Sequence, residues 1–343
     1  MQPLAGSFEF IQAKVHALRS RVYEHERLDD LCDLRTIAQL WHRLYPEADP
    51  GDHRTLQRRL LADHIHTLET VRRHLPSELT DFYAWMMRRY QVENLKVLLR
   101  AWKAHEPIEQ VLPFLAPLMP DMALDPRPFL RTSSLGDFLM LIPVAELRVA
   151  GERAGARYAD TGETFFIETA FDTAYYAHLL DRHEGLPARH REGTHALILN
   201  EVSIFDILSI FRLKLNYGMR YEQAAVFLVP AIGGPMELER LYDYPDFGDM
   251  VERIPEELLP HAPRPEIETI ADLELALWER GLQRANAQFY HSVEDLGAAV
   301  AFATIKRMEL ANLFRVIEGM RYGLSPEAIR QGFIRPRPLA LVH

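Results

Sequence analysis

The chain has 343 residues, of which 48% are hydrophobic, and its 49 acidic residues outnumber the 39 lysines and arginines, for a net charge of −10 at pH 7. This composition excludes a disordered, collagen-like or small disulfide-scaffold protein, and the length favours two or three units that each bury a core. It also argues against a nucleic-acid partner, since phosphates are usually neutralised by clustered basic side chains, whereas an acidic surface suits a basic protein partner.

The cysteine content and the lengths of the apolar runs indicate the cellular compartment of the protein and its relation to the membrane. Cys32 is the single cysteine, so neither an internal disulfide nor a cysteine-based zinc site can form, and a reducing, cytoplasmic setting is the natural interpretation. The N-terminal residues lack the basic start and apolar core of an export signal. The densest apolar runs, at 138–145 and 296–305, are shorter than the roughly 18 residues that span a bilayer. We therefore expect membrane contact only through partners.

Apolar side chains recur at steps of three and four residues along most of the chain, a pattern that predicts helices. The pattern is clear in 11–22 and again in 61–71. Only the stretches 138–147 and 164–167 resemble strands. We therefore predict an all-α fold.

Prolines divide these helices into groups. Proline clusters lie at 113–128 and 255–265, and a proline–glycine group lies at 230–235 between them. Each cluster should end a helical unit, because proline removes a backbone donor and clashes with the preceding turn.

A seven-residue pattern occurs three times and is the most informative feature of the sequence. The copies are Asn94–Arg100, Asp206–Arg212 and Asn312–Glu318; the second begins 112 residues after the first, and the third begins 106 residues after the second. Each copy has three apolar residues in the spacing of one helix face: Leu95, Leu98 and Leu99; Ile207, Ile210 and Phe211; Leu313, Val316 and Ile317. Each copy therefore predicts one buried stripe of a helix.

The polar residues that flank each stripe allow two interpretations. Asn94, Asp206 and Asn312 precede the stripes and either hold the helix against a neighbouring turn through bonds to backbone, which we favour, or touch a partner. Arg100 and Arg212 follow the first two stripes. They are interface candidates, because the planar arginine fork suits carboxylates across a contact, but an intramolecular ion pair is an equal alternative.

Similarity continues beyond the stripes. Gly218 and Gly323 follow the second and third copies, and the segment after Glu106 resembles them more weakly. Gly323 suits a helix C-cap, and Ser325 before Pro326 suits the start of the next helix. Because a period near 110 residues is too long for a solenoid, we predict three successive helical units.

These motifs resemble those of the C-subunit family of the prokaryotic V/A-type rotary ATPases, whose eukaryotic counterpart is the d-subunit of the V-ATPase. The family hallmark is an acidic-x-x-Asn-Ile/Leu-x-x-hydrophobic-hydrophobic-Arg helix followed by a glycine turn. Tyr90–Arg100 resembles its first copy and Lys306–Gly319 its third, and further similarity lies in Phe171–Tyr176 and in the opening helix from Phe8 to Val22.

The chain also departs from the family pattern. Gln91 and Ser203 stand where the family often has an acid, and Asp206 stands where Asn is expected. In the third copy, Arg307 replaces a common Glu and Glu318 replaces the closing Arg.

The resemblance implies a funnel-shaped, all-α body of three similar lobes around a pseudo-threefold axis, for which we predict the divisions 1–125, 126–235 and 236–343. It further implies a non-catalytic rotor component without a cofactor, seated on the cytoplasmic face of the membrane. There it would link the central shaft subunits to the membrane proteolipid ring. The alternative is a soluble helical scaffold of the same fold outside a rotary ATPase, an interpretation to which the departures lend weight.

Catalytic patterns are scarce. The sequence has neither a glycine-rich phosphate loop nor a Gly-x-Ser-x-Gly elbow, so we expect no catalytic residues. Histidines are dense at 178–195, but they lack the i, i+4 pair of a zinc-protease helix, and His64 and His66 would point about 200° apart on a helix. We therefore expect solvated histidines and no metal, with a metal-dependent enzyme as the third hypothesis. The acidic segment 237–279 is interpreted as solvated surface rather than a docking face.

Overall fold

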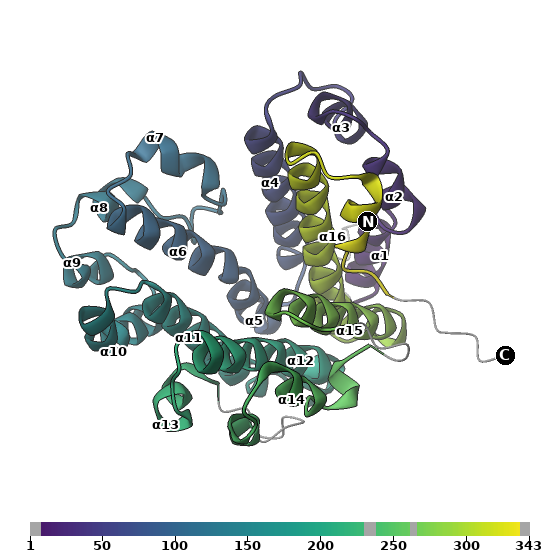
Figure 1. Cartoon of the computed structure of the whole chain (residues 1–343). Helices are drawn as coiled ribbons and strands as arrows, with labels where there is room; N and C mark the ends of the chain where they lie inside the picture. The colour runs from purple at the N-terminus through teal and green to yellow at the C-terminus, as the bar shows by residue number, and fades with distance from the viewer. Residues whose placement is uncertain (1–7, 230–237, 261–265, 337–343) are drawn as a thin grey trace.

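The computed structural model describes residues 8–229, 238–260 and 266–336 (Figure 1). Within these ranges the chain is helical and contains no strand, which confirms the predicted all-α fold. The stretches that resemble strands contribute to helices: residues 138–140 lie in α9 (Leu135–Met140), 145–147 in α10 (Ala145–Thr161) and 165–167 in α11 (Phe165–Glu184). A short apolar run fits a strand and a buried helix segment equally well, and here packing decides for helix.

The other elements in the described ranges are also helices. They are α1 (Phe8–Arg19), α2 (Glu26–Cys32), α3 (Ile37–Leu44), α4 (His53–Arg72), α5 (Ser77–Met87), α6 (Arg89–Lys103), α7 (Ile108–Val111), η1 (Leu112–Phe114), α8 (Pro126–Arg131), α12 (Ala188–Phe211), η2 (Arg212–Asn216), α13 (Tyr221–Ala224), η3 (Ala225–Phe227), η4 (Leu238–Asp243), α14 (Phe247–Glu252), η5 (Glu256–Leu258), α15 (Ile270–His291), α16 (Gly297–Arg321) and α17 (Pro326–Gln331).

The three sequence copies lie on α6, α12 and α16, with the end of the second copy reaching η2. The nine apolar residues of the three stripes are all buried, as the helical spacing predicts. After each long helix the chain turns and forms a short helix, which is α7, α13 or α17. The repeat is therefore a structural unit made of a long helix, a turn and a short helix.

The turn is made in the same way three times. His105, Gly218 and Gly323 have positive φ angles of 53°, 60° and 68°, the left-handed conformation that ends a helix and that glycine adopts without steric cost. Ser325 then caps α17 by accepting a hydrogen bond from the backbone N–H of Ala328, which confirms the predicted cap.

The long helices of the three copies pack in a cycle. α6 packs against α11, α12 packs against α15, and α16 packs against α4; Figure 1 shows α4 and α16 side by side although they are distant in sequence. The first and last parts of the chain share a separate core, in which Leu31 and Leu56 pack with Val316 and Phe333. The division into lobes at 125/126 and 235/236 stays a prediction, and the second boundary lies outside the described residues.

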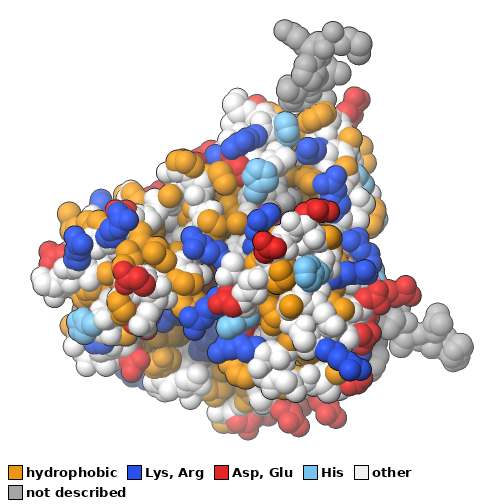
Figure 2. Space-filling model, turned by 90° about the horizontal axis from the view of Figure 1, so that it is seen from above, with side chains coloured by type: hydrophobic (Ala, Val, Ile, Leu, Met, Phe, Trp, Pro, Cys, Tyr) orange, Lys and Arg blue, Asp and Glu red, His pale blue; other side chains and the backbone are white. Residues whose placement is uncertain are grey.

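The surface is charged and mixed. Figure 2 shows Lys and Arg side chains bordering a hollow near the middle of the face seen from above, so the net negative charge is not spread evenly over the protein. None of the helices in the described ranges has both the length and the apolar character that crossing a membrane requires.

Candidate functional site

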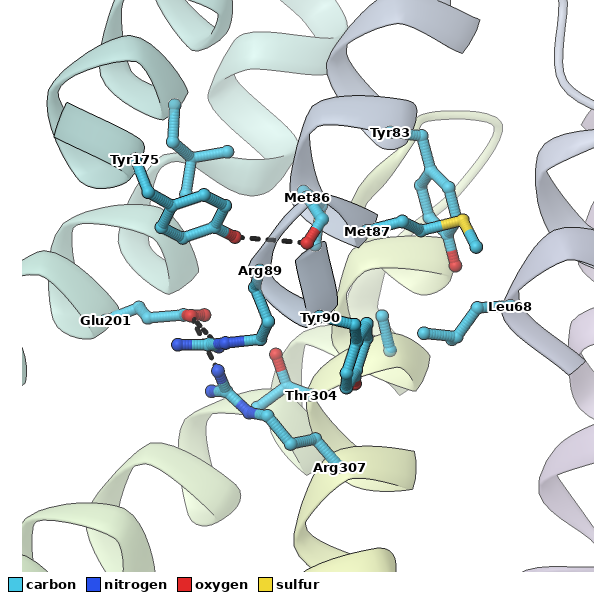
Figure 3. A pocket seen from close by; sticks show the side chains of 12 residues that line it. Leu68, Tyr83, Met86, Met87, Arg89, Tyr90, Tyr175, Glu201, Thr304 and Arg307 are labelled. Carbon is cyan, nitrogen blue, oxygen red and sulfur yellow. Dashed lines mark hydrogen bonds and ion pairs between the residues drawn. The ribbon is translucent and has the colours of Figure 1, made fainter. Parts of the chain in front are cut away.

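Three charged side chains meet where the long helices α6, α12 and α16 converge. Arg89 and Arg307 each donate a hydrogen bond to the same oxygen of Glu201, over 2.7 Å in the case of Arg307 (Figure 3). Arg89, Glu201 and Arg307 each stand five residues before the polar residue of their copy. The cluster is therefore one position of the repeat, present three times and brought to one point; we call it the central triad.

The central triad is nearly closed to solvent. The side chains of Arg89, Glu201 and Arg307 are 19%, 9% and 14% exposed. The guanidinium of Arg89 also donates to the Tyr176 hydroxyl over 2.5 Å, and that of Arg307 lies 4.4 Å from the centre of the Trp278 ring. Burial raises the pKa of the Glu201 carboxyl, while the positive charge of Arg89 acts to lower it. The two arginines supply the charge that makes a carboxylate tolerable at this depth.

A small cavity adjoins the central triad. It has a volume of about 20 Å³, which is room for one water molecule. Apolar and aromatic side chains form most of its wall, and Figure 3 shows Tyr175 donating to the backbone carbonyl of Met86 beside it, over 3.1 Å. At this point the hydrogen bonds of the central triad join α6, α12 and α16.

The asparagines that open the first and third stripes bind backbone in the same way. Asn94 donates to the carbonyl of Ala116 over 2.9 Å and accepts from its N–H over 2.7 Å. Asn312 makes the same pair of bonds with Ile334, both at 2.8 Å. In each case the partner lies 22 residues further along the chain. Each side chain thus holds the segment after the short helix against the long helix, which is the interpretation we favoured.

Asp206 takes this place in the second copy with different chemistry. Its Oδ1 accepts from the N–H of Val229 over 2.9 Å, across 23 residues. Burial raises the pKa of the Asp206 carboxyl to about 8. A neutral Asp206 still offers an acceptor oxygen, so it reproduces the accepting half of the bond pair that Asn94 and Asn312 make with backbone.

The residues that close the three stripes link each copy to the next. Arg100 donates to Glu168 at the start of α11 over 3.0 Å, and Arg212 donates to Glu274 at the start of α15 over 3.1 Å. In the third copy the charge is reversed, and Glu318 accepts from Gln57 of α4 over 2.8 Å. Because α4 belongs to the first part of the chain, the third link connects the last copy to the first. The three links therefore connect the copies in a closed cycle. Whether Arg100 and Arg212 also touch a partner stays a prediction.

The family-like stretch Phe171–Tyr176 packs on the first copy. Lys96 of α6 donates to the Asp172 carboxylate of α11 over 3.1 Å. Burial raises the pKa of Asp172 to about 6, and the nearby Lys96 acts to lower it. Tyr176 meets Arg89 of the central triad. This stretch therefore joins the second unit to the first.

The repeat pattern that begins at Asn94 did not predict the central triad. An alignment that begins at Asn94 stops short of it, and Arg307 drew attention only as a departure from the family pattern. The signal that could have found the triad is the same pair of offsets, 112 and 106 residues, which joins Arg89 to Glu201 and Glu201 to Arg307. At these offsets the repeat position carries Arg, Glu and Arg, charges that pair once the three helices converge.

The histidine-rich segment is helical rather than a solvated loop. His178 and His183 lie on α11, and His190 and His195 lie on α12. Near the N-terminus, His64 is buried beside the Tyr90 hydroxyl, and burial lowers its pKa to about 3. Among the described residues, the group able to hold a metal ion is formed by His183, Glu184 and His195.

Comparison with known proteins agrees with these motifs. The family model described as ATP synthase (C/AC39) subunit matches residues 11–332. The C-subunit of the A-type ATP synthase of Thermococcus kodakarensis is 22% identical over 94% of this chain and 89% of its own length. The proteins of the same name from Methanosphaera stadtmanae and Methanobrevibacter smithii are 20% and 22% identical, over 93% and 66% of this chain and 85% and 60% of their own lengths.

Proposed function

Because the chain belongs to the family of ATP synthase (C/AC39) subunits, we propose that it is the part of the rotor that couples the central shaft to the membrane proteolipid ring. The name shared by its relatives makes it a subunit of an A/V-type ATP synthase. In this role the protein lies on the cytoplasmic face of the membrane and touches the membrane only through its partners. It serves proton or sodium transport that is driven by ATP or that drives ATP synthesis.

The observation that carries this proposal is the closed set of links between the copies. Three long helices are joined at one point by the central triad, and three further links connect each copy to the next, at Arg100, Arg212 and Glu318. A body that passes torque has to resist shear between its parts. Close packing along continuous apolar stripes, together with the central triad and the three links between neighbouring copies, supplies that stiffness.

We further propose that the copies surround a pseudo-threefold axis near Glu201 and form a three-lobed funnel. The equivalence of the central triad, of the three bonds to backbone and of the three links supports this arrangement. ATP turnover belongs to other subunits, since the sequence contains no glycine-rich phosphate loop.

The coupling role is tested in inside-out membrane vesicles from the protein's own host. We expect vesicles without this chain to retain ATP hydrolysis by the catalytic subunits but to lose ATP-driven acidification or sodium uptake. Adding back the purified chain should restore transport. Undiminished transport in its absence would contradict the proposal.

A pull-down of the tagged chain from gently solubilised membranes tests its partners. We expect a coiled-coil shaft protein and a proteolipid in the retained fraction. Recovery of neither, from cells that contain an intact rotary ATPase, together with constant recovery of unrelated proteins, would instead favour the alternative of a helical scaffold.

A further inference from the structure

A group of possible metal ligands lies where α11 ends and α12 begins. His183 and Glu184 are the last residues of α11, and His195 lies on α12. One ligand atom from each of the three side chains lies within 4.8 Å of the other two. The rings of His183 and His195 are stacked, with 5.6 Å between their centres. None of the three residues belongs to the central triad, the bonds to backbone or the links between copies, so the coupling role does not use the group.

The hydrogen bonds of His183 leave one ring nitrogen available. Nε2 lies 3.2 Å from the backbone carbonyl of Arg191 and 3.1 Å from the Thr194 hydroxyl. The carbonyl only accepts, and the hydroxyl donates its own hydrogen to the His190 carbonyl over 2.8 Å, so we assign the proton to Nε2. The lone pair is therefore on Nδ1. This atom is buried and has no hydrogen-bond partner among the described residues, and it lies 3.8 Å from Oε1 of Glu184.

The hydrogen bonding of the His183 ring matches that of a histidine that binds a metal ion. A histidine that binds a metal usually donates its other ring N–H to a carbonyl or carboxylate, which fixes the ring and its tautomer. The side chain of His183 is 1% exposed, and a buried acceptor without a partner is costly.

We propose that His183, Glu184 and His195 bind one divalent transition-metal ion of the zinc class. Two imidazole nitrogens and a carboxylate oxygen are typical zinc ligands, with water completing the coordination, whereas calcium and magnesium prefer oxygen alone. Two ligands of one tetrahedral zinc ion lie roughly 3.3 Å apart. Glu184 and His195 are exposed, so rotations of their side chains bring the three atoms to this separation.

One existing contact competes with the ion. Arg191 lies 3.6 Å from Oε2 of Glu184, while Oε1 faces His183. The ion takes Oε1 and leaves the other oxygen with the guanidinium. Binding ties the last turn of α11 to α12 and so fixes the angle between the two helices.

The test is metal binding by the full chain, freed of any histidine tag and stripped with a chelator. Calorimetry with zinc chloride should give one equivalent per chain, and cobalt(II) should produce visible absorption bands of a nitrogen- and oxygen-ligated site. His195→Ala and Glu184→Gln should each weaken zinc binding at least tenfold. Both residues are exposed, so neither variant disturbs the core as a change of His183 would.

His178→Ala is the matched control. His178 lies on the same helix, but its Nδ1 pairs with Asp181 at 3.1 Å, so zinc binding should be unchanged. Zinc should also raise the unfolding temperature of the wild type and of His178→Ala, but not that of His195→Ala. Absence of stoichiometric binding, or equal affinity in His195→Ala and the wild type, would overturn the proposal. Because the isolated chain is measured, neither result bears on the coupling role.

Discussion

Arg307 donates a 2.7 Å hydrogen bond to Glu201, although the two residues hold the same position in successive copies of a repeat. Arg89, at that position in the first copy, bonds to the same carboxylate oxygen. Identical charges at a meeting point of equivalent positions would repel one another. Here the three positions carry a positive, a negative and a positive charge, so the carboxylate attracts both guanidinium groups and holds the three helices together.

Removing the acid of the central triad should destabilise the protein strongly. Glu201→Ala leaves two largely buried guanidinium groups facing each other without a carboxylate, which should lower the free energy of unfolding by about 3–5 kcal/mol. Urea denaturation followed by circular dichroism measures the change. As the control, the triple variant Arg89→Met, Glu201→Leu and Arg307→Met should be near the wild type, because it removes all three charges. A small effect of Glu201→Ala would contradict this role.

Asp206→Asn should stabilise the protein increasingly as pH rises. The folded-state pKa of Asp206 is raised to about 8 by burial, from an ordinary value of 3.8. The wild type therefore loses stability between about pH 4 and pH 8 as the folded protein resists ionisation. Asparagine does not ionise and keeps the oxygen that accepts from Val229, so its advantage should grow across this window by on the order of 1.4 kcal/mol per pH unit. Melting temperatures at pH 5 and pH 8 test this, and parallel pH curves for the two proteins would contradict it.

Asn94→Ala should cost about 2–4 kcal/mol of stability. The substitution leaves the N–H and the carbonyl of Ala116, both bonded to Asn94, without their partner in a buried setting. Gln110→Ala, at an exposed position of α7, is the control and should have little effect. Chemical denaturation of both variants measures the difference. Equal stabilities would show that the bonds to backbone do not matter.

Reversing the charge of Arg100 should weaken both stability and retention in the complex, and a charge swap should restore them. Arg100→Glu faces Glu168 at the link between α6 and α11, and the cost is at most about 1 kcal/mol because Arg100 is half exposed. The double variant Arg100→Glu, Glu168→Arg rebuilds the pair. Co-purification with the central shaft is measured beside thermal unfolding. Restored stability without restored co-purification would show that Arg100 contacts a partner.

His105→Gly should stabilise the first turn. His105 has a φ of 53° where the other two copies have glycine, and a left-handed conformation costs a residue with a side chain roughly 1 kcal/mol. We expect a gain of about 0.5–1 kcal/mol in urea denaturation. Gly323→Ala imposes the same strain on the third turn and should lose a similar amount. A loss of stability in His105→Gly would mean that the imidazole makes a contact worth more than the strain.

Local patterns predicted the helices, their buried faces and the turns between them. The stripes around Leu95, Ile207 and Leu313 are buried because helical periodicity is read within a few residues. The cap at Ser325 follows from adjacent residues in the same way. The stretches 138–147 and 164–167 resemble strands because a short apolar run has no period long enough to distinguish a strand from a buried helix.

Sequence by itself therefore determined three copies of one helical unit and their family, since periodicity, caps and motif spacing are local properties. Only the tertiary structure decided that Arg89, Glu201 and Arg307 meet at one buried point. It also decided that Glu318 of the third copy accepts a hydrogen bond from Gln57 in the first part of the chain. These contacts join residues more than 100 positions apart. Their energies depend on which faces the packed helices present to each other, and no pattern within one helix specifies that.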